Sequence, residues 1–217
     1  IVGSETLSVA GSGTVSSANV GNAKNLTTSG LSLIDNSGQA SNYSIASASS
    51  DITQRPLNLS GSRAYDSTRT ASGSDLSFAN SVSGETLGLT GSGVLDSPAA
   101  GSRTIVNTNT LAISDGSGIA TNYTLTNGTL TMTIVPRSTT VSGTKTYDGT
   151  TNVASSNLTS FSNLAGSDTL SLSGTGTIST ADVGTGKTVN ASGLTIDNSS
   201  GVGSNYTLSA ATVNVTE

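Results

Sequence analysis

Three stretches of the chain are versions of one another. They are Ser41–Ile45 (SNYSI), Thr121–Leu125 (TNYTL) and Ser204–Leu208 (SNYTL). Their tyrosines, Tyr43, Tyr123 and Tyr206, lie 80 and 83 residues apart, so a unit of about 80 residues recurs. A period this long exceeds the roughly 20–50 residues of solenoid coils and propeller blades. We therefore expect each copy to be a small domain with its own core.

Two other anchors recur in the same register. An acidic residue, a threonine and a leucine lead into a Gly-x-Gly pair at Glu5–Leu7, Glu85–Leu87 and Asp168–Leu170. A Tyr-Asp pair occurs at Tyr65-Asp66 and at Tyr147-Asp148, where Gly149 follows. This register predicts a complete repeat over residues 56–137 (repeat 2), another over 138–217 (repeat 3), and the C-terminal part of a preceding one over 1–55 (repeat 1). Because repeat 1 begins in mid-unit, we expect a fragment of a much longer protein.

The local pattern is that of β-strands. Residues 123–134 alternate apolar residues with threonine on both sides of Asn127-Gly128, which is the signal for a hairpin closed by a type I′ turn. Shorter alternating segments at 6–9, 86–89 and 169–172 end at the Gly-x-Gly pairs, where a strand should bend or stop. Residues 158–164 fit either a short helix or an irregular strand. No window keeps helical spacing beyond about one turn.

Short strands with frequent turn signals predict an all-β chain of tandem, immunoglobulin-like, small antiparallel β-sandwiches of about 80 residues. β-grasp-like units and a β-solenoid are the alternatives. The repeated tyrosines and phenylalanines are expected in the thin cores. In repeat 1 the early strands are missing, so its apolar face should be exposed unless something covers it; that face comprises Leu7, Val9, Leu31, Leu33 and Ile45.

Composition excludes several functional classes. The chain has no His and no Cys, which removes the commonest general base, the thiol nucleophile and the usual zinc ligands. We therefore expect no enzyme and no cofactor. With eight Lys and Arg and a net charge of −5, the chain also lacks the basic clusters that nucleic acid or anionic membrane would require. No apolar run is long enough for a membrane span.

The acidic loops just before each Asn-Tyr pair raise the question of calcium. Asp35, Asp115 and Asp197 each begin a loop rich in oxygen ligands, which Ca²⁺ accepts. Each loop offers one carboxylate and no distal Glu, and Asp, Asn, Ser and Gly are also ordinary turn residues. Turn formation is the favoured interpretation of these loops. The same applies to Asp66 and Asp148, which we expect to accept hydrogen bonds from backbone N–H groups.

Repeat 3 resembles the bacterial YDG repeat domain. The residues that carry the resemblance are Lys145–Thr151 (KTYDGTT), Asp168–Leu172, Asp182–Gly184 with Lys187, Gly193-Leu194 and Asn205–Leu208. Repeat 2 departs from the pattern, with Ser67 after Tyr-Asp and Ser97–Gly101 in place of the usual Asn-Val-Gly, whereas repeat 1 keeps Asn19–Gly21. Residues 134–137 and 52–55 resemble the junction between units of this family.

The resemblance implies location and role. Domains of this kind occur in tandem in large exported proteins, such as filamentous-haemagglutinin-like adhesins and biofilm exoproteins, and they carry no catalytic motif. We therefore expect an extracellular stalk segment whose partners are neighbouring repeats, with head-to-tail self-association through open strand edges as a further expectation. The alternative function is a multivalent module that binds a surface glycan or calcium through the repeated tyrosine motifs.

Overall fold

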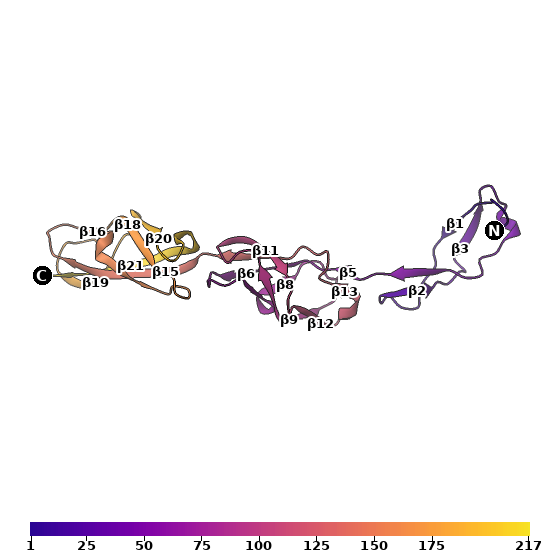
Figure 1. The fold of residues 1–217 in the computed structure, drawn as a ribbon, viewed down its shortest axis with the longest axis horizontal. Helices are drawn as coiled ribbons and strands as arrows, with labels where there is room; N and C mark the ends of the chain where they lie inside the picture. The colour runs from indigo at the N-terminus through magenta and orange to yellow at the C-terminus, as the bar shows by residue number, and fades with distance from the viewer. The chain divides into compact units, whose positions relative to one another are not determined.

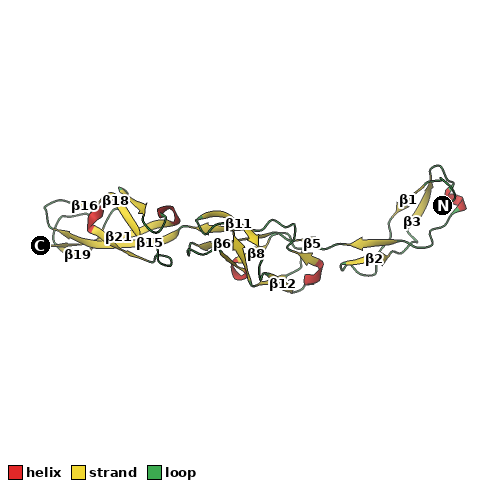
Figure 2. Ribbon diagram, viewed as in Figure 1, coloured by secondary structure: helices red, strands yellow, loops and turns green.

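The computed structural model describes residues 1–217, and every regular element in it is a β-strand or a single 3₁₀ turn (Figures 1 and 2). The all-β prediction is confirmed. A β-grasp unit needs an α-helix for its sheet to wrap around, so that alternative is wrong. None of the 3₁₀ turns has the length or hydrophobicity of a helix that could cross a bilayer.

The chain divides into two compact units. Unit 1 comprises residues 1–57, 80–88 and 113–128, and unit 2 comprises residues 58–79, 89–112 and 129–217. The division passes through repeat 2, so unit 1 holds repeat 1 with one part of repeat 2, and unit 2 holds the other part with repeat 3. The repeat boundaries drawn from the sequence stay a prediction.

Repeat 3 consists of two sheets. One has the order β17-β15-β21-β19, from β15 (Arg137–Thr146), β17 (Leu158–Ser162), β19 (Gly184–Thr188) and β21 (Tyr206–Thr216). The other has the order β16-β18-β20, from β16 (Asn152–Ala154), β18 (Leu170–Thr177) and β20 (Leu194–Asn198). The ambiguous segment 158–164 is thus largely strand β17, which follows the 3₁₀ turn η4 (Ser155–Asn157). Four of the five strand pairs of repeat 3 are antiparallel, which also contradicts the β-solenoid alternative.

In repeat 3 one strand pair departs from the purely antiparallel prediction. The first and last strands of repeat 3, β15 and β21, lie side by side and parallel from Arg137 opposite Tyr206 to Thr146 opposite Thr216 (Figure 1). Parallel neighbours need a long crossover connection. Here the whole repeat provides that connection. The sheet type was predicted from local hairpin signals, and such signals do not report a pairing between the two ends of a repeat.

The part of repeat 2 in unit 2 forms a six-stranded sheet with the order β7-β10-β11-β14-β6-β8. Its strands are β6 (Leu59–Ala64), β7 (Thr70–Ser72), β8 (Leu76–Phe78), β10 (Ser92–Leu95), β11 (Gly101–Asn107) and β14 (Thr131–Val135), and the 3₁₀ turn η2 (Gly73–Asp75) precedes β8. The first and last of these strands in the chain, β6 and β14, are again parallel neighbours. The closing of a repeat by its two ends is therefore a shared feature of repeats 2 and 3.

Unit 1 contains three two-stranded sheets. They pair β1 (Leu7–Gly11) with β3 (Leu31–Asp35), β2 (Gly21–Asn25) with β4 (Ser49–Ile52), and β5 (Arg55–Pro56) with β13 (Tyr123–Thr124).

The 3₁₀ turns η1 (Ala40–Asn42), η3 (Ala120–Asn122) and η5 (Gly203–Asn205) precede the Asn-Tyr tyrosines of the three repeats. The remaining strands are β9 (Leu87–Thr90) and β12 (Ala112–Asp115).

The hairpin predicted at Asn127-Gly128 is wrong. Only Asn127 has a positive φ, of 63°, whereas a type I′ turn needs positive φ at both central residues. In unit 1 the Leu57 N–H donates to the Thr124 carbonyl, and in unit 2 the Leu59 N–H donates to the Thr129 carbonyl. The segments on either side of Asn-Gly therefore pair with the start of the repeat rather than with each other. The alternating residues correctly predicted strands. The Asn127-Gly128 pair, however, lies in the loop between β13 (Tyr123–Thr124) and β14 (Thr131–Val135) and closes no hairpin.

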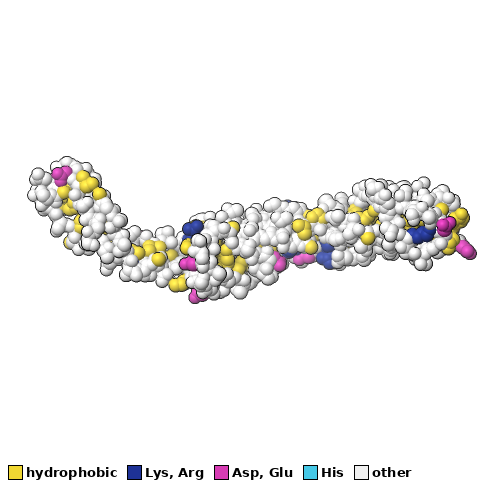
Figure 3. Space-filling view, turned by 180° about the vertical axis from the view of Figure 1, so that it is seen from behind, with side chains coloured by type: hydrophobic (Ala, Val, Ile, Leu, Met, Phe, Trp, Pro, Cys, Tyr) yellow, Lys and Arg dark blue, Asp and Glu magenta, His cyan; other side chains and the backbone are white.

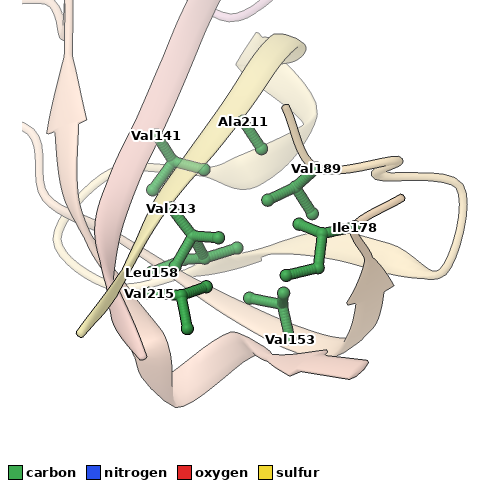
Figure 4. Close-up of a cluster of buried hydrophobic side chains, with 8 residues drawn as sticks. All are labelled: Val141, Val153, Leu158, Ile178, Val189, Ala211, Val213 and Val215. Carbon is green, nitrogen blue, oxygen red and sulfur yellow. The ribbon is translucent and has the colours of Figure 1, made fainter. Parts of the chain in front are cut away.

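The core of repeat 3 is a cluster of small aliphatic side chains (Figure 4). It consists of Val141, Val153, Leu158, Ile178, Val189, Ala211, Val213 and Val215, all buried, with Phe161 and Leu172 among the half-buried side chains packed against them. β-Branched residues suit strands of this kind because they pack well on a pleated surface. The alternating apolar residues of 206–216 thus supply one wall of the core.

Repeat 1 has no buried hydrophobic side chain. Of the apolar face singled out from the sequence, Val9 is 61% exposed, and the other four residues are half-buried. A cavity of about 430 Å³ opens among residues that include Leu31, Leu33 and Ile45. The strands that cover the corresponding face of repeat 3 have no counterpart in residues 1–55.

The first glycine of each Gly-x-Gly pair produces the bend expected there. Gly11, Gly91 and Gly174 have φ values of 91°, 79° and 90°. A Cβ atom on any of them would lie 2.0 Å from a carbonyl oxygen of the neighbouring segment, that of Gly30, Thr110 and Gly193 respectively. Glycine is required here both for its backbone conformation and for the close approach.

Replacing Gly174 by alanine should therefore destabilise repeat 3 strongly. We expect Gly174→Ala to lower the free energy of unfolding by about 3 kcal/mol or more, because strain at positive φ adds to a backbone clash. Gly149→Ala is the matched control, since Gly149 also has a positive φ, of 73°, but has no atom within 4 Å of the added Cβ. Urea denaturation measures both, and equal losses for the two variants would contradict this interpretation.

Candidate functional site

The tyrosine of the Asn-Tyr pair has the same surroundings in all three repeats. Its hydroxyl donates to the acidic residue that precedes Thr-Leu: Tyr43 to Glu5, Tyr123 to Glu85, and Tyr206 to Asp168 at 2.6 Å. The same hydroxyl accepts a backbone N–H from Val2, Val82 and Ala165, at 3.0, 3.4 and 3.0 Å. We call this arrangement the tyrosine–carboxylate anchor. It joins segments about 40 residues apart within each repeat.

The anchor shifts the ionisation of its phenols. Burial, and then the hydrogen bond to Asp168, raise the pKa of Tyr206 to about 12. In unit 1 the hydrogen bonds to Glu5 and Glu85 are the main reason that the pKa values of Tyr43 and Tyr123 are raised. A phenol that donates to a carboxylate is held in its neutral form.

In unit 2 the anchor of repeat 3 also receives a tyrosine from repeat 2. The Tyr65 hydroxyl donates to Asp168 Oδ2 at 3.1 Å, so Tyr65 and Tyr206 share one carboxylate oxygen. The two rings meet edge to face, with centroids 5.4 Å apart and planes at 76°, a favoured arrangement for aromatic pairs. The Arg137 guanidinium donates to the Tyr65 carbonyl at 3.3 Å. Tyr65 is only 5% exposed as a result.

The asparagine of the Asn-Tyr pair makes a second bond between repeats. In unit 2 the Asn205 Oδ1 accepts the Ala100 N–H at 2.8 Å, and in unit 1 the Asn122 Oδ1 accepts the Val20 N–H at 2.9 Å. Ala100 and Val20 occupy corresponding places in the loop that the sequence pattern marks as Asn-Val-Gly. The same hydrogen bond therefore forms at both repeat junctions, and Asn205 is 4% exposed. Asn42, the corresponding residue of repeat 1, is exposed.

A cation and a carboxylate shape the turn after each Tyr-Asp tyrosine. Asp148 Oδ1 accepts the Thr150 N–H and hydroxyl, both at 2.9 Å, and pairs with Lys145 Nζ at 2.8 Å. Lys145 is 4% exposed and also donates to the carbonyls of Thr150 and Asn152. The hydrogen bond from Lys145, and then those from Thr150, lower the pKa of Asp148 to about 2. Asp148 thus forms a local turn, as the sequence suggested.

Repeat 2 builds this turn with a different cation. Asp66 accepts the Thr68 N–H and hydroxyl at 2.8 and 2.9 Å and pairs with Arg63 at 2.5 Å. Ser67 takes the place of Gly149 and keeps a positive φ, of 64° against 73°. The departure of repeat 2 from the Tyr-Asp-Gly pattern therefore leaves the turn intact.

Tyr147 does not follow the prediction that the repeated tyrosines are core residues. Tyr65, Tyr123 and Tyr206 are buried and Tyr43 is half-buried, but Tyr147 is 53% exposed and its hydroxyl has no hydrogen-bond partner. The reason is that a Tyr-Asp tyrosine points out of its own repeat. Tyr65 is covered by repeat 3, whereas nothing covers Tyr147.

Two of the three calcium candidates, Asp35 and Asp115, accept turn hydrogen bonds in the structure, whereas Asp197 lies within β20 (Leu194–Asn198). Asp35 Oδ1 accepts the Ala40 N–H at 2.6 Å, and Asp115 Oδ1 accepts the Ala120 N–H at 2.7 Å. In repeat 3 this bond is made by Asn198, to the Gly203 N–H at 2.7 Å. Asn198, and not Asp197, is therefore the counterpart of Asp35 and Asp115. The alignment of the three loops from the sequence was wrong by one residue. No three acidic side chains gather in the chain.

A chain of small β units with one anchor repeated three times is a tandem β-repeat protein. The profile of the YDG domain family matches residues 1–50, 53–132 and 128–213. The chain therefore belongs to the YDG domain family. Neither the curated proteins nor the solved structures contain a match to it.

Sequence reasoning placed the connection between repeats at residues 134–137 but did not find the side-chain contacts across it. It identified the Asn-Tyr and Tyr-Asp pairs but treated their tyrosines as core residues and assigned no task to the asparagine. One signal was available: Asn42, Asn122 and Asn205 are identical in three repeats whose neighbouring residues vary. An amide that is kept beside a tyrosine can indicate a hydrogen bond whose partner is distant in the chain.

The raised pKa of Tyr206 predicts a loss of stability in alkali. The folded state holds this phenol neutral up to about pH 12, whereas the unfolded chain ionises it near 10, so its contribution is complete below pH 10 and is lost as the pH rises to about 12. The free energy of unfolding should fall across this range. In Tyr206→Phe a part of the fall should be missing. Parallel pH profiles for the wild type and Tyr206→Phe would count against the anchor.

Proposed function

We propose that this chain is a non-catalytic structural segment, the stalk of a large extracellular bacterial adhesin or surface filament. Residues 56–137 and 138–217 form two successive domains of this stalk, each an immunoglobulin-like pair of packed sheets, and residues 1–55 belong to a third. Adding repeats extends the reach of such a stalk without requiring new chemistry.

The observation that carries this proposal is the repeated hydrogen bond at the junctions. Asn205 to Ala100 and Asn122 to Val20 are the same contact made twice. At the junction in unit 2, β14 ends at Val135 and β15 begins at Arg137, so Pro136 alone separates the two strands. Proline fixes φ and stiffens a connection. A short connection and a side-chain bond across it suit a segment that holds a position rather than a flexible linker.

The composition of the surface supports the same role. Charged side chains make up 10% of the residues, and the face in Figure 3 carries only scattered acidic and basic side chains. Such a surface stays hydrated without strong fields that would attract nucleic acid or charged membrane. An extracellular location is part of this proposal, because a stalk of an adhesin or surface filament acts outside the cell.

The alternative, a glycan- or calcium-binding module, has less support. The carboxylates of Asp35, Asp66, Asp115 and Asp148 accept backbone N–H groups in turns. The Asn-Tyr tyrosines are engaged by their own carboxylates. Apart from the exposed Tyr147, these groups thus already serve the fold.

Loss of the junction amide should weaken unit 2. We expect Asn205→Ala to lower the free energy of unfolding by about 1–3 kcal/mol, because it leaves the partly buried Ala100 N–H without a partner. It should also speed hydrogen exchange at the Ala100 amide. Asn42→Ala is the matched control, because that asparagine is exposed and its side chain has no partner; its effect should stay within about 0.5 kcal/mol. Equal effects of the two substitutions would argue against a stabilising hydrogen bond between Asn205 and Ala100 at the junction.

Ligand titration separates the two functional classes. The chain is titrated with Ca²⁺ and with a glycan panel while its melting temperature is followed. A site filled to about 100 times its dissociation constant would stabilise the fold by roughly 2.7 kcal/mol. The stalk proposal expects no shift with any of these ligands. A saturable shift that disappears in a Tyr206→Phe variant that still folds would overturn the proposal in favour of a binding module.

A further inference from the structure

We propose that the face of repeat 3 formed by Tyr147 and Val183 is a docking surface for the Asn-Tyr end of another YDG repeat. This inference rests on the proposed structural function and deepens it. The Tyr-Asp tyrosine acts as a projecting side chain, and the Asn-Tyr end of the following repeat provides the socket that receives it. The structure contains this pair in three states: one joined, one socket open, and one tyrosine free.

The joined state lies in unit 2. Tyr65 of repeat 2 inserts beside Tyr206 of repeat 3 and donates to Asp168, while Ala100 of repeat 2 donates its N–H to Asn205. On repeat 3 the Tyr206 ring and the Asp168 carboxylate contact the Tyr65 phenol of repeat 2, and the Asn205 amide oxygen accepts the Ala100 N–H. The match is specific, because each polar group of the socket has its own partner on the projecting repeat.

The open socket lies in unit 1. A cavity of about 300 Å³ is lined by Asn19, Val20, Arg55, Glu85, Asn122 and Tyr123. Glu85, Asn122 and Tyr123 correspond to Asp168, Asn205 and Tyr206, which surround Tyr65 in the joined state. Residues 1–55 contain no Tyr-Asp pair. The cavity therefore opens where a phenol side chain would sit, and its existence supports the socket independently of the joined state.

The free tyrosine is Tyr147. It is 53% exposed, and Val183, the counterpart of Ala100, is 51% exposed with a backbone N–H that has no partner. Both residues flank the end of β21: the Tyr147 N–H donates to the Thr216 carbonyl, and Gly184 pairs with Val215. The ion pair of Lys145 with Asp148 fixes the turn that follows Tyr147. The turn after Tyr147 is therefore built like the turn after Tyr65, where Asp66 pairs with Arg63.

These features identify the occupant as a repeat of the same family. The phenol needs a carboxylate acceptor with an aromatic edge beside it, and the Val183 N–H needs an amide oxygen. An Asn-Tyr end with its acidic residue supplies all three, as it does for Tyr65 and Ala100 in the joined state. A glycan offers hydroxyl groups but neither a carboxylate fixed by a second tyrosine nor an aromatic edge, so it matches only part of the surface.

A chain lengthened by one repeat tests the docking directly. Residues 137–217 are added a second time after Glu217, which corresponds to Pro136 in the repeat register. In the added copy the counterpart of Tyr147 is replaced by phenylalanine, so that the peptide containing Tyr147 is unique; the tyrosines are then nitrated with tetranitromethane and located by peptide mass spectrometry. In the 217-residue chain we expect Tyr147 to react many times faster than Tyr65. In the lengthened chain Tyr147 should be protected to the level of Tyr65. An undiminished rate at Tyr147, with the added counterpart of Tyr206 protected by its own fold, would overturn the proposal.

A second measurement needs only the 217-residue chain. Tyr65→Phe removes a hydroxyl that bonds to Asp168, whereas Tyr147→Phe removes one that bonds to nothing. We expect Tyr65→Phe to lower the melting temperature by several degrees and Tyr147→Phe to leave it unchanged. Equal melting temperatures for the two variants would overturn the docking role of the Tyr-Asp tyrosine. Neither result depends on Ca²⁺ or glycan binding, so this inference can fail while the stalk proposal stands, and the reverse.

Discussion

The tyrosine–carboxylate anchor is the interaction on which the rest of the structure depends. A chain with 3% aromatic residues and cores of valine and leucine has little apolar surface to bury, so its few large side chains must fix distant segments. The phenol does this with an aromatic ring in the interior and a hydroxyl held between a carboxylate and a backbone N–H. A partly buried hydrogen bond to a charged group contributes more than a neutral one.

The same anchor also makes the junction possible. Asp168 can accept a second phenol because Tyr206 occupies only part of the capacity of its oxygen. Asn205 is placed beside it by the 3₁₀ turn η5, with its amide oxygen directed at the Ala100 N–H. An arrangement that closes one repeat thus presents, on its outer side, the groups that hold the preceding repeat. Stability within a repeat and attachment between repeats are therefore coupled.

Much of this could be predicted from the sequence. The alternation of Leu170 and Leu172 gave strand β18, the spacing of Tyr43, Tyr123 and Tyr206 gave the repeat, and the Gly-x-Gly pairs gave the bends. The parallel pairing of β15 with β21 could not, because its partners lie about 70 residues apart and each strand looks the same whatever its neighbour. The side-chain contacts across the junction could not be predicted for a similar reason: the pattern around a buried tyrosine is the same whether its own repeat or the next one covers it.

A double-mutant cycle on Tyr65 and Asp168 tests the central claim that side chains of one repeat are energetically coupled to the anchor of the next. The free energies of unfolding are measured for the wild type, Tyr65→Phe, Asp168→Asn and the double variant. The account predicts a coupling energy of about 1 kcal/mol or more, as expected for groups in direct contact. A coupling energy within about 0.3 kcal/mol of zero would mean that the two repeats only lie next to each other.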